Sequence, residues 1–291
     1  FNEKTLWTGG PNDMGSYGQY KNFGSVFVED LSGDIGNTAD NCARDYVRYL
    51  DLETGIGGVD YKSATTKYSR RYLASYPDGA VVALYKSKGR KKLHLRVSMV
   101  AGDDLGVSET KYDESGSGRF GGKLTSVAFE ARFKVIPTGK NASVKKTGAG
   151  IEVSNADEVK LVLIGATNFD IAQPSCISPT VDVKTLVSDR VRKVSSKPWT
   201  EILRDHIADF SPFIKRVELQ LGKASSALPT NKLIDFYNDD VKNLTGTEPE
   251  SLFLEQLYFA YGRYLEVSSS RGVDLPSNLQ GIWNNMSHAP W

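Results

Sequence analysis

Alternation of apolar residues over the first 170 positions limits the possible folds of this chain more than any other feature. Between Val127 and Val135 every second residue is apolar, and Glu130, Arg132 and Lys134 fill the positions between them. Side chains alternate faces along a β-strand, so this stretch predicts a strand with a buried apolar face and these charged residues facing out. Similar patterns predict further strands around residues 46–53, 58–61, 68–74, 80–86, 93–99, 151–153 and 160–164.

The segments between these strands are short and rich in turn-forming residues. Many strands with few helical intervals favour stacked antiparallel sheets over β-α-β units, so we expect a large β-sandwich. The glycine-rich stretch Gly116–Gly122 lacks the Lys-Ser/Thr ending of a phosphate-binding loop and is interpreted as a hairpin loop. The basic cluster Lys86–Lys92 is interpreted as a charged turn.

After about residue 180 the apolar period changes from two to that of a helix. Apolar residues at helical spacing predict one helix over 183–194 and a second from Pro198 to Phe210, with His206 on its apolar stripe. His206 is therefore interpreted as a core residue. Pro212, Gly222 and Pro229 are expected to break the chain and to form a linker between domains.

A last helix is predicted to start at Thr247-Glu-Pro-Glu250, a capping-box pattern, and to end before Gly272. Apolar and aromatic residues cover most of its circumference, more than one partner could bury. We therefore expect this helix to belong to a bundle of several helices.

Composition excludes several classes of protein. The 291 residues carry 36 Lys+Arg against 35 Asp+Glu, a net charge of +1, so nucleic acid is not an expected partner. Apolar runs have the length of strands, so no membrane-spanning helix is predicted. Cys42 and Cys176 leave open whether they form a disulfide or remain free thiols.

No pattern in the sequence predicts a metal or a cofactor. The three histidines form no cluster with cysteine and no HExxH pair, which are the common zinc patterns. The pairs Asp103-Asp104 and Asp239-Asp240 lack the ligand spacing of a calcium loop and are interpreted as solvated turns.

The candidate sugar-binding residues combine amides with tryptophans, mostly near the C-terminus. Amides offer donors and acceptors to hydroxyl groups, and indole rings offer flat apolar faces to the C–H face of a sugar. The alternative is structural: the amides hold an irregular loop and the tryptophans wedge it against the helices. The candidates are Trp7, Asn278, Gln280, Trp283, Asn284, His288 and Trp291.

An ordered series of motifs along nearly the whole chain resembles glycoside hydrolase family 95. The motifs are Asn2-Glu-Lys-Thr-Leu-Trp-Thr-Gly-Gly-Pro, Lys21-Asn-Phe-Gly, Arg48-Tyr-Leu-Asp-Leu-Glu, Ala74-Ser-Tyr-Pro-Asp-Gly, Asp205-His-Ile-Ala-Asp-Phe and Leu275-Pro-Ser-Asn-Leu-Gln-Gly-Ile-Trp-Asn-Asn. The resemblance implies a mainly β chain with α: an N-terminal antiparallel β-supersandwich, a helical linker and the first helix of an incomplete (α/α)6 barrel. It implies domains at 1–180, where the first strands of the family's sandwich are lacking and an edge could be open to another chain, 181–245 and 246–291.

The same resemblance implies inverting hydrolysis of terminal α-L-fucosides, with α-L-galactosides accepted by some members. In similar enzymes a glutamic acid and a pair of asparagines supported by an aspartate perform the reaction. These positions map beyond Trp291, so no catalytic residue is assigned in this chain. The expected partner is a fucosylated glycan, together with a companion chain if one carries the rest of the barrel, and the expected location is secreted, periplasmic or at the cell surface. The competing hypothesis is a non-catalytic carbohydrate-binding or structural β-sandwich module.

Overall fold

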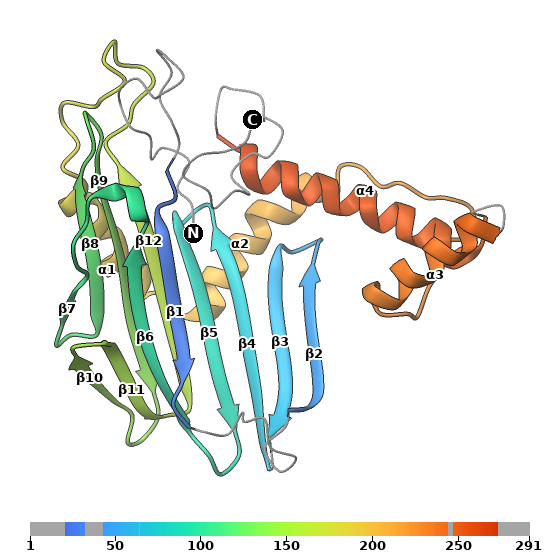
Figure 1. Ribbon diagram of the computed structural model, residues 1–291, viewed down its shortest axis with the longest axis horizontal. Coiled ribbons are helices and arrows are strands. Elements are labelled where there is room, and N and C mark those ends of the chain that lie inside the picture. Colours follow the sequence, from blue (N-terminus) through green and yellow to red (C-terminus); the bar gives the residue numbers. More distant parts are fainter. Residues whose placement is uncertain (1–20, 33–42, 64, 244–246, 273–291) are drawn as a thin grey trace. The chain divides into compact units, whose positions relative to one another are not determined.

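The computed structural model describes residues 21–32, 43–63, 65–243 and 247–272 (Figure 1). Within these residues the chain divides into two compact units. The boundary falls between residues 206 and 207, inside helix α2 (Trp199–Ile214), and residues 51–55 belong to the second unit.

Two antiparallel sheets make up most of the first unit, which confirms the predicted β-sandwich. The larger sheet has the order β2 (Arg44–Asp51), β3 (Ile56–Ser63), β4 (Thr66–Ser75), β5 (Ala80–Lys88), β12 (Glu158–Thr167), β9 (Ala128–Thr138), β8 (Ser117–Lys123) and β7 (Lys111–Asp113). The smaller sheet has the order β1 (Gly24–Asp30), β6 (Leu93–Ala101), β11 (Gly150–Ala156) and β10 (Ser143–Thr147).

The main core lies between the two sheets and is built by the alternation found in the sequence. Phe129 and Phe133 of β9 and Val97 and Met99 of β6 are each at most 2% exposed. The ring of Phe23 meets Phe129 edge-on, with ring centroids 6.0 Å apart. The prediction of a buried apolar face on these strands is therefore confirmed.

The prediction for the opposite face of β9 was wrong. Glu130 is only 1% exposed, because helix α1 (Val183–Ser196) packs on β9 and β12. Arg132 donates to Glu130 at 2.6 Å and to Ser188 of α1 at 3.1 Å. Alternating polarity marks which face is polar, but it does not show that a helix covers that face.

Helix α1 has the predicted apolar stripe, and this stripe forms a second core against the outer face of the larger sheet. Val187 is fully buried there, together with Val162 and Ile164 of β12. Asp182 caps the helix by accepting a hydrogen bond from the backbone N–H of Lys184. At the other end Lys160 donates to the carbonyls of the last turn, among them Ser195 at 2.9 Å.

Several local predictions on the sandwich need correction. The stretch Gly116–Gly122 is mostly strand β8 rather than a loop, and only Gly116, at φ +87°, lies in the preceding turn. Glycines obscure a strand because they add no side chain to the alternation. Strand β5 runs through Lys88, so only the second half of the cluster Lys86–Lys92 forms the turn. Strands β1, β7 and β10 were not predicted.

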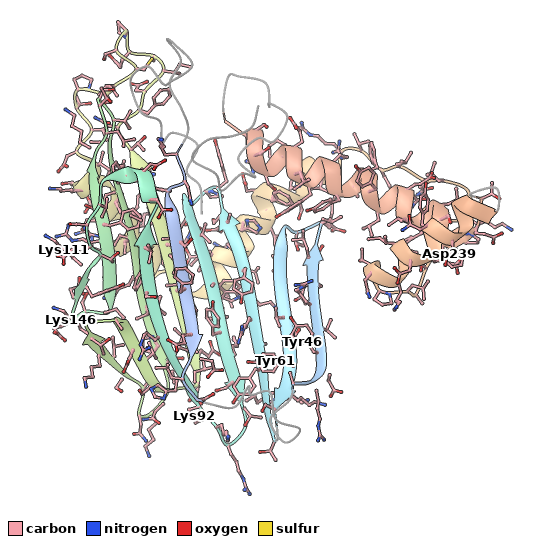
Figure 2. All side chains as sticks on the ribbon, in the orientation of Figure 1. Tyr46, Tyr61, Lys92, Lys111, Lys146 and Asp239 are labelled. Atoms are coloured by element: carbon pink, nitrogen blue, oxygen red, sulfur yellow. The ribbon has the colours of Figure 1, made fainter. Side chains whose placement is uncertain are left out.

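Strand β2 lies at one edge of the larger sheet (Figure 1), and all eight of its residues are exposed. Tyr46, labelled in Figure 2, is 56% exposed. Its neighbour Val47 is 55% exposed, and successive residues of a strand point to opposite faces. Among the described residues, no strand pairs with the outer edge of β2. This edge, with exposed apolar side chains on both faces of the strand, is therefore open to pairing with a further strand.

Helices follow the sandwich as predicted, with corrections in their detail. Pro212 was expected to break the chain but lies inside α2, two residues before its end. Helix α3 (Thr230–Asn243) contains Asp239, which was predicted to lie in a turn.

Helix α4 (Pro249–Ser270) ends before Gly272 as predicted. Its N-cap residue is Glu248, whose side chain makes no capping hydrogen bond, so the predicted capping box is wrong. Within the second unit α4 packs against α3, and it still exposes Tyr258, Phe259 and Tyr261. None of the helices in the described ranges is long and apolar enough to cross a membrane.

Candidate functional site

The predicted sugar-binding residues lie outside the residues that the structure describes. This holds for all seven: Trp7, Asn278, Gln280, Trp283, Asn284, His288 and Trp291. Their proposed contacts with a sugar stay a prediction. The structure instead shows how the residues before the amide-rich segment, residues 274–285, are held, and which other polar sites the two units contain.

In the second unit the end of α4 is tied to α2 by a charged pair. Arg271, the residue after α4, donates two hydrogen bonds to the carboxylate of Asp209, at 2.7 and 2.8 Å. Its guanidinium also lies 4.3 Å from the ring centroid of Phe213, a cation–π distance. About two turns earlier, within α4, Arg263 donates to the carbonyl of Phe213 at 2.9 Å. The chain therefore enters the amide-rich segment from a fixed point.

In the first unit a partly buried lysine, Lys197, joins two of the motifs that carry the resemblance. Nζ of Lys197 lies 2.7 Å from Oδ1 of Asp78 and 2.9 Å from Oδ2 of Asp205. Asp78 follows the Ala74-Ser-Tyr-Pro part of its motif in the β4–β5 turn, and its side chain is 3% exposed. Ser75 completes the site by donating to Asp78 at 2.7 Å.

The charges of this cluster stabilise one another. The hydrogen bond from Lys197, followed by that from Arg204, holds the pKa of Asp205 below its ordinary value of 3.8. The hydrogen bonds to Asp205 and then Asp78 raise the pKa of Lys197. The charged forms of Lys197 and Asp205 are thus favoured near neutral pH, as in a structural ion pair.

The other buried ionisable groups also have structural partners. Glu130 pairs with Arg132 beneath α1, and its second oxygen lies 3.9 Å from Arg119. Burial lowers the pKa of Lys160, which caps α1.

Several predictions about aspartate, histidine and cysteine side chains can be compared with the described residues. They contain no group of three or more His, Cys, Asp or Glu side chains that could hold a metal ion. Asp103 and Asp104 lie in an exposed single turn of 3-10 helix, as the interpretation of a solvated turn predicted. His206 is 3% exposed, which confirms it as a core residue. Cys176 is a half-buried free thiol, and Cys42 lies outside the described residues.

One open site in the first unit was not singled out by the sequence. A groove of about 530 Å³ lies along β3, β4 and β5 and is bordered by Asp45 of β2. We call it the basic groove. Its charged lining residues are Asp45, Asp60, Lys62, Lys67, Arg71, Lys86 and Lys88, so five cations meet two carboxylates. In the sequence these lysines and Arg71 alternate with Tyr61, Tyr68 and Tyr72, a pattern that could have indicated the groove. Only the pairing of the strands brings the cationic side chains together.

Comparison with known protein families and solved structures indicates the class of protein to which the chain belongs. Residues 12–172 match the glycosyl hydrolase family 65 N-terminal domain, and residues 198–291 match the glycosyl hydrolase family 95 catalytic domain. A solved structure titled putative kojibiose phosphorylase from human microbiome has the same fold over 92% of this chain and 35% of its own, with a TM-score of 0.50 and 10% identity. The two family matches place the sandwich and the helices among glycoside hydrolase domains, and the solved structure supports the fold alone.

Two curated relatives align over almost the entire chain. Alpha-L-fucosidase 2 of Arabidopsis thaliana is 24% identical over 100% of this chain, and probable alpha-fucosidase A of Aspergillus oryzae is 29% identical over 98%. The chain spans 40% of the length of each of these relatives. The family model that covers more than half of the chain shows that it contains a glycosyl hydrolase family 65 N-terminal domain. The match of residues 198–291 and the two relatives support its assignment as an N-terminal portion of the glycoside hydrolase family 95, α-L-fucosidase type.

Proposed function

We propose that this chain is the N-terminal portion of an inverting glycoside hydrolase that removes terminal α-L-fucosyl units, and in some substrates α-L-galactosyl units, from glycans. The observation that carries the proposal is the alignment of the whole chain with two α-fucosidases. In this proposal residues 1–180 form the sandwich, 181–245 the linker and 246–291 the start of a catalytic barrel. The enzyme acts outside the cytoplasm, where glycans are displayed, as a secreted, periplasmic or cell-surface protein.

The catalytic groups are proposed to lie beyond Trp291, on a longer version of this chain or on a companion chain. Inversion requires an acid that protonates the leaving oxygen and a base that activates water on the opposite face, roughly 6.5–9.5 Å apart. None of the buried carboxylates described above faces such an arrangement. Glu130 lies under α1 against Arg132, and Asp78 is bound to Lys197.

The role proposed for this chain is to support and shape part of the sugar site. The pairing of Arg271 with Asp209 supports this role, because it anchors the residue from which the amide-rich segment departs. Gln280, Trp283 and Asn284 are then proposed to contact the sugar, with amides at its hydroxyls and the indole at its C–H face.

A free-standing binding module is the competing proposal, and the exposed aromatic side chains of α4 weigh against it. Tyr258 is 78% exposed and Phe259 is 40% exposed. A module that ends with this helix would leave these rings in water, whereas further barrel helices would bury them.

The test compares the 291-residue chain with a version extended at its C-terminus to the length of the fucosidase relatives. Both are assayed on 4-nitrophenyl α-L-fucoside, with 4-nitrophenyl β-D-galactoside as the control substrate. We expect turnover only by the extended chain, and proton NMR should detect β-L-fucose as the first product because the configuration inverts. Turnover by the short chain would refute the placement of the catalytic groups, and inactivity of the extended chain would favour the binding module.

Substitutions in the extended chain test the sugar contacts. Trp283→Ala, Gln280→Ala and Asn284→Ala are each expected to raise KM while the melting temperature stays close to that of the parent. Severe unfolding of Gln280→Ala or Asn284→Ala would instead assign these amides a structural role.

A further inference from the structure

The basic groove contains a row of lysines that the fold alone does not explain. Lys62 of β3 is directly opposite Lys67 of β4, and Lys67 is directly opposite Lys88 of β5. Directly opposite residues of antiparallel strands point to the same face, with Cβ atoms about 4.5–5.5 Å apart. Like charges in this position destabilise a sheet. Mutual repulsion in this row is therefore expected to favour the binding of an anion.

The carboxylates around the row neutralise only part of it. Lys62 pairs with Asp45, Arg71 forms two hydrogen bonds with Asp60, and the remaining ion pair joins Lys86 to Glu158 of β12. No carboxylate in the described part of the chain forms an ion pair with Lys67 or Lys88, and both are exposed. The groove thus offers two ammonium groups to a ligand.

The groove is also open and has an aromatic border. The same face of the larger sheet carries α1 at β9 and β12, but at β3, β4 and β5 it leaves about 530 Å³ of space. Tyr49 of β2 borders this face, where its ring lies 5.4 Å from the guanidinium of Arg71 and is 37% exposed. Cations, a hydroxyl at Ser69 and a half-exposed ring suit a ligand with both anionic and apolar surfaces.

The two carboxylates of the groove, Asp45 and Asp60, favour an acidic polysaccharide over a nucleic acid as the bound polyanion. A nucleic acid carries a charge on every unit of its backbone and would bring phosphates against Asp45 and Asp60. A polysaccharide presents hydroxyl groups between its acidic groups, and these hydroxyls can donate to the two carboxylates. The chain as a whole has a net charge of only +1, so no general field gathers phosphates.

We propose that the basic groove binds a segment of an acidic polysaccharide, one whose sugar units carry carboxylate or sulfate ester groups, across strands β3, β4 and β5. The groove then holds the polymer on the sandwich of this glycoside hydrolase. This proposal rests on the assignment of the chain to the glycoside hydrolases. It does not require that the enzyme hydrolyse α-L-fucosides.

The experiment measures binding of the 291-residue chain to immobilised polysaccharides by biolayer interferometry. Polygalacturonate supplies carboxylates, a sulfated galactan supplies sulfate esters, and an uncharged galactan is the neutral control. We expect binding to at least one of the acidic polymers, little binding to the neutral one, and weakening by added salt because exposed charges are screened. The comparison of the two acidic polymers identifies the anionic group. Absence of binding to both would overturn the proposal.

A double variant and its matched control locate the site. Lys67→Gln with Lys88→Gln removes the two available ammonium groups, and we expect affinity to fall at least about tenfold. Lys111→Gln with Lys146→Gln makes the same charge change at two exposed lysines on β7 and β10, away from the groove (Figure 2), and should leave affinity within about twofold. Equal losses in both variants, or equally tight binding of duplex DNA by the parent chain, would contradict the assignment.

Discussion

Replacing Asp78 by alanine tests whether the ion pairs of Lys197 with Asp78 and Asp205 stabilise the first unit. The carboxylate of Asp78, in the β4–β5 turn, is 3% exposed and accepts a hydrogen bond from Lys197, which lies between α1 and α2. The lysine side chain is 16% exposed and also lies 2.9 Å from Asp205 and 3.9 Å from Glu201. Asp78→Ala therefore removes the most buried of its three carboxylate partners.

The magnitude follows from this geometry. Removing one partner of a buried ion pair costs about 3–5 kcal/mol, because the other charge is left without compensation. Lys197 keeps Asp205 and is partly exposed, so we expect the lower end, about 3 kcal/mol. For a domain of this size that corresponds to a melting temperature lower by roughly 6–12 °C.

The assay is urea unfolding followed by circular dichroism, with Asp189→Ala as the control. Asp189 pairs with Arg192 on α1, but the two side chains are 57% and 81% exposed, so its loss should cost less than about 1 kcal/mol. Combining Asp78→Ala with Lys197→Met should destabilise by less than the sum of the single changes, with a coupling of about 0.5–3 kcal/mol. The reasoning is refuted if Asp78→Ala costs no more than Asp189→Ala.

Three further predictions concern the core, the lysine row and the response to acid. Phe133→Ala removes a fully buried ring between the sheets and should lower the free energy of unfolding by about 3–5 kcal/mol in a urea titration. Lys67→Gln relieves repulsion among Lys62, Lys67 and Lys88 and should raise the free energy of unfolding by about 0.2–1 kcal/mol, while it weakens polysaccharide binding. Unchanged or lower stability would contradict the repulsion. Because the folded-state pKa of Asp205 lies below 3.8, its stabilising effect is complete above that pH and is lost as the pH falls through the folded-state pKa. Asp205→Asn should therefore make the melting temperature less dependent on pH below 3.8, and an unchanged dependence would argue against the contact with Lys197.

The strands that bury one face and the helices with one apolar stripe could be predicted from the sequence. For β9 and α1 the repeat of apolar residues matches the backbone period, so the element type follows directly from hydrophobic burial. Strand β8 was missed because its glycines give no alternation. The capping box before α4 was misplaced because capping depends on backbone angles that four residue names do not specify.

The candidate sites depended more strongly on contacts between distant residues. The motifs contained Asp78, Asp205 and Asp209, but nothing in them indicated Lys197 or Arg271 as partners. The partners come from other elements, 119 and 62 residues away for Asp78 and Asp209, so sequence spacing carries no trace of them.

The sequence by itself determined the succession of sandwich and helices and, through its ordered motifs, the family. Both depend on local patterns, since burial of apolar side chains selects the backbone period residue by residue. Only the tertiary structure decided that Glu130 lies beneath α1 and that Lys62, Lys67 and Lys88 form one row. These outcomes are set by which strands pair, in which register, and by which helix covers which face, and such choices involve residues that are far apart in the chain.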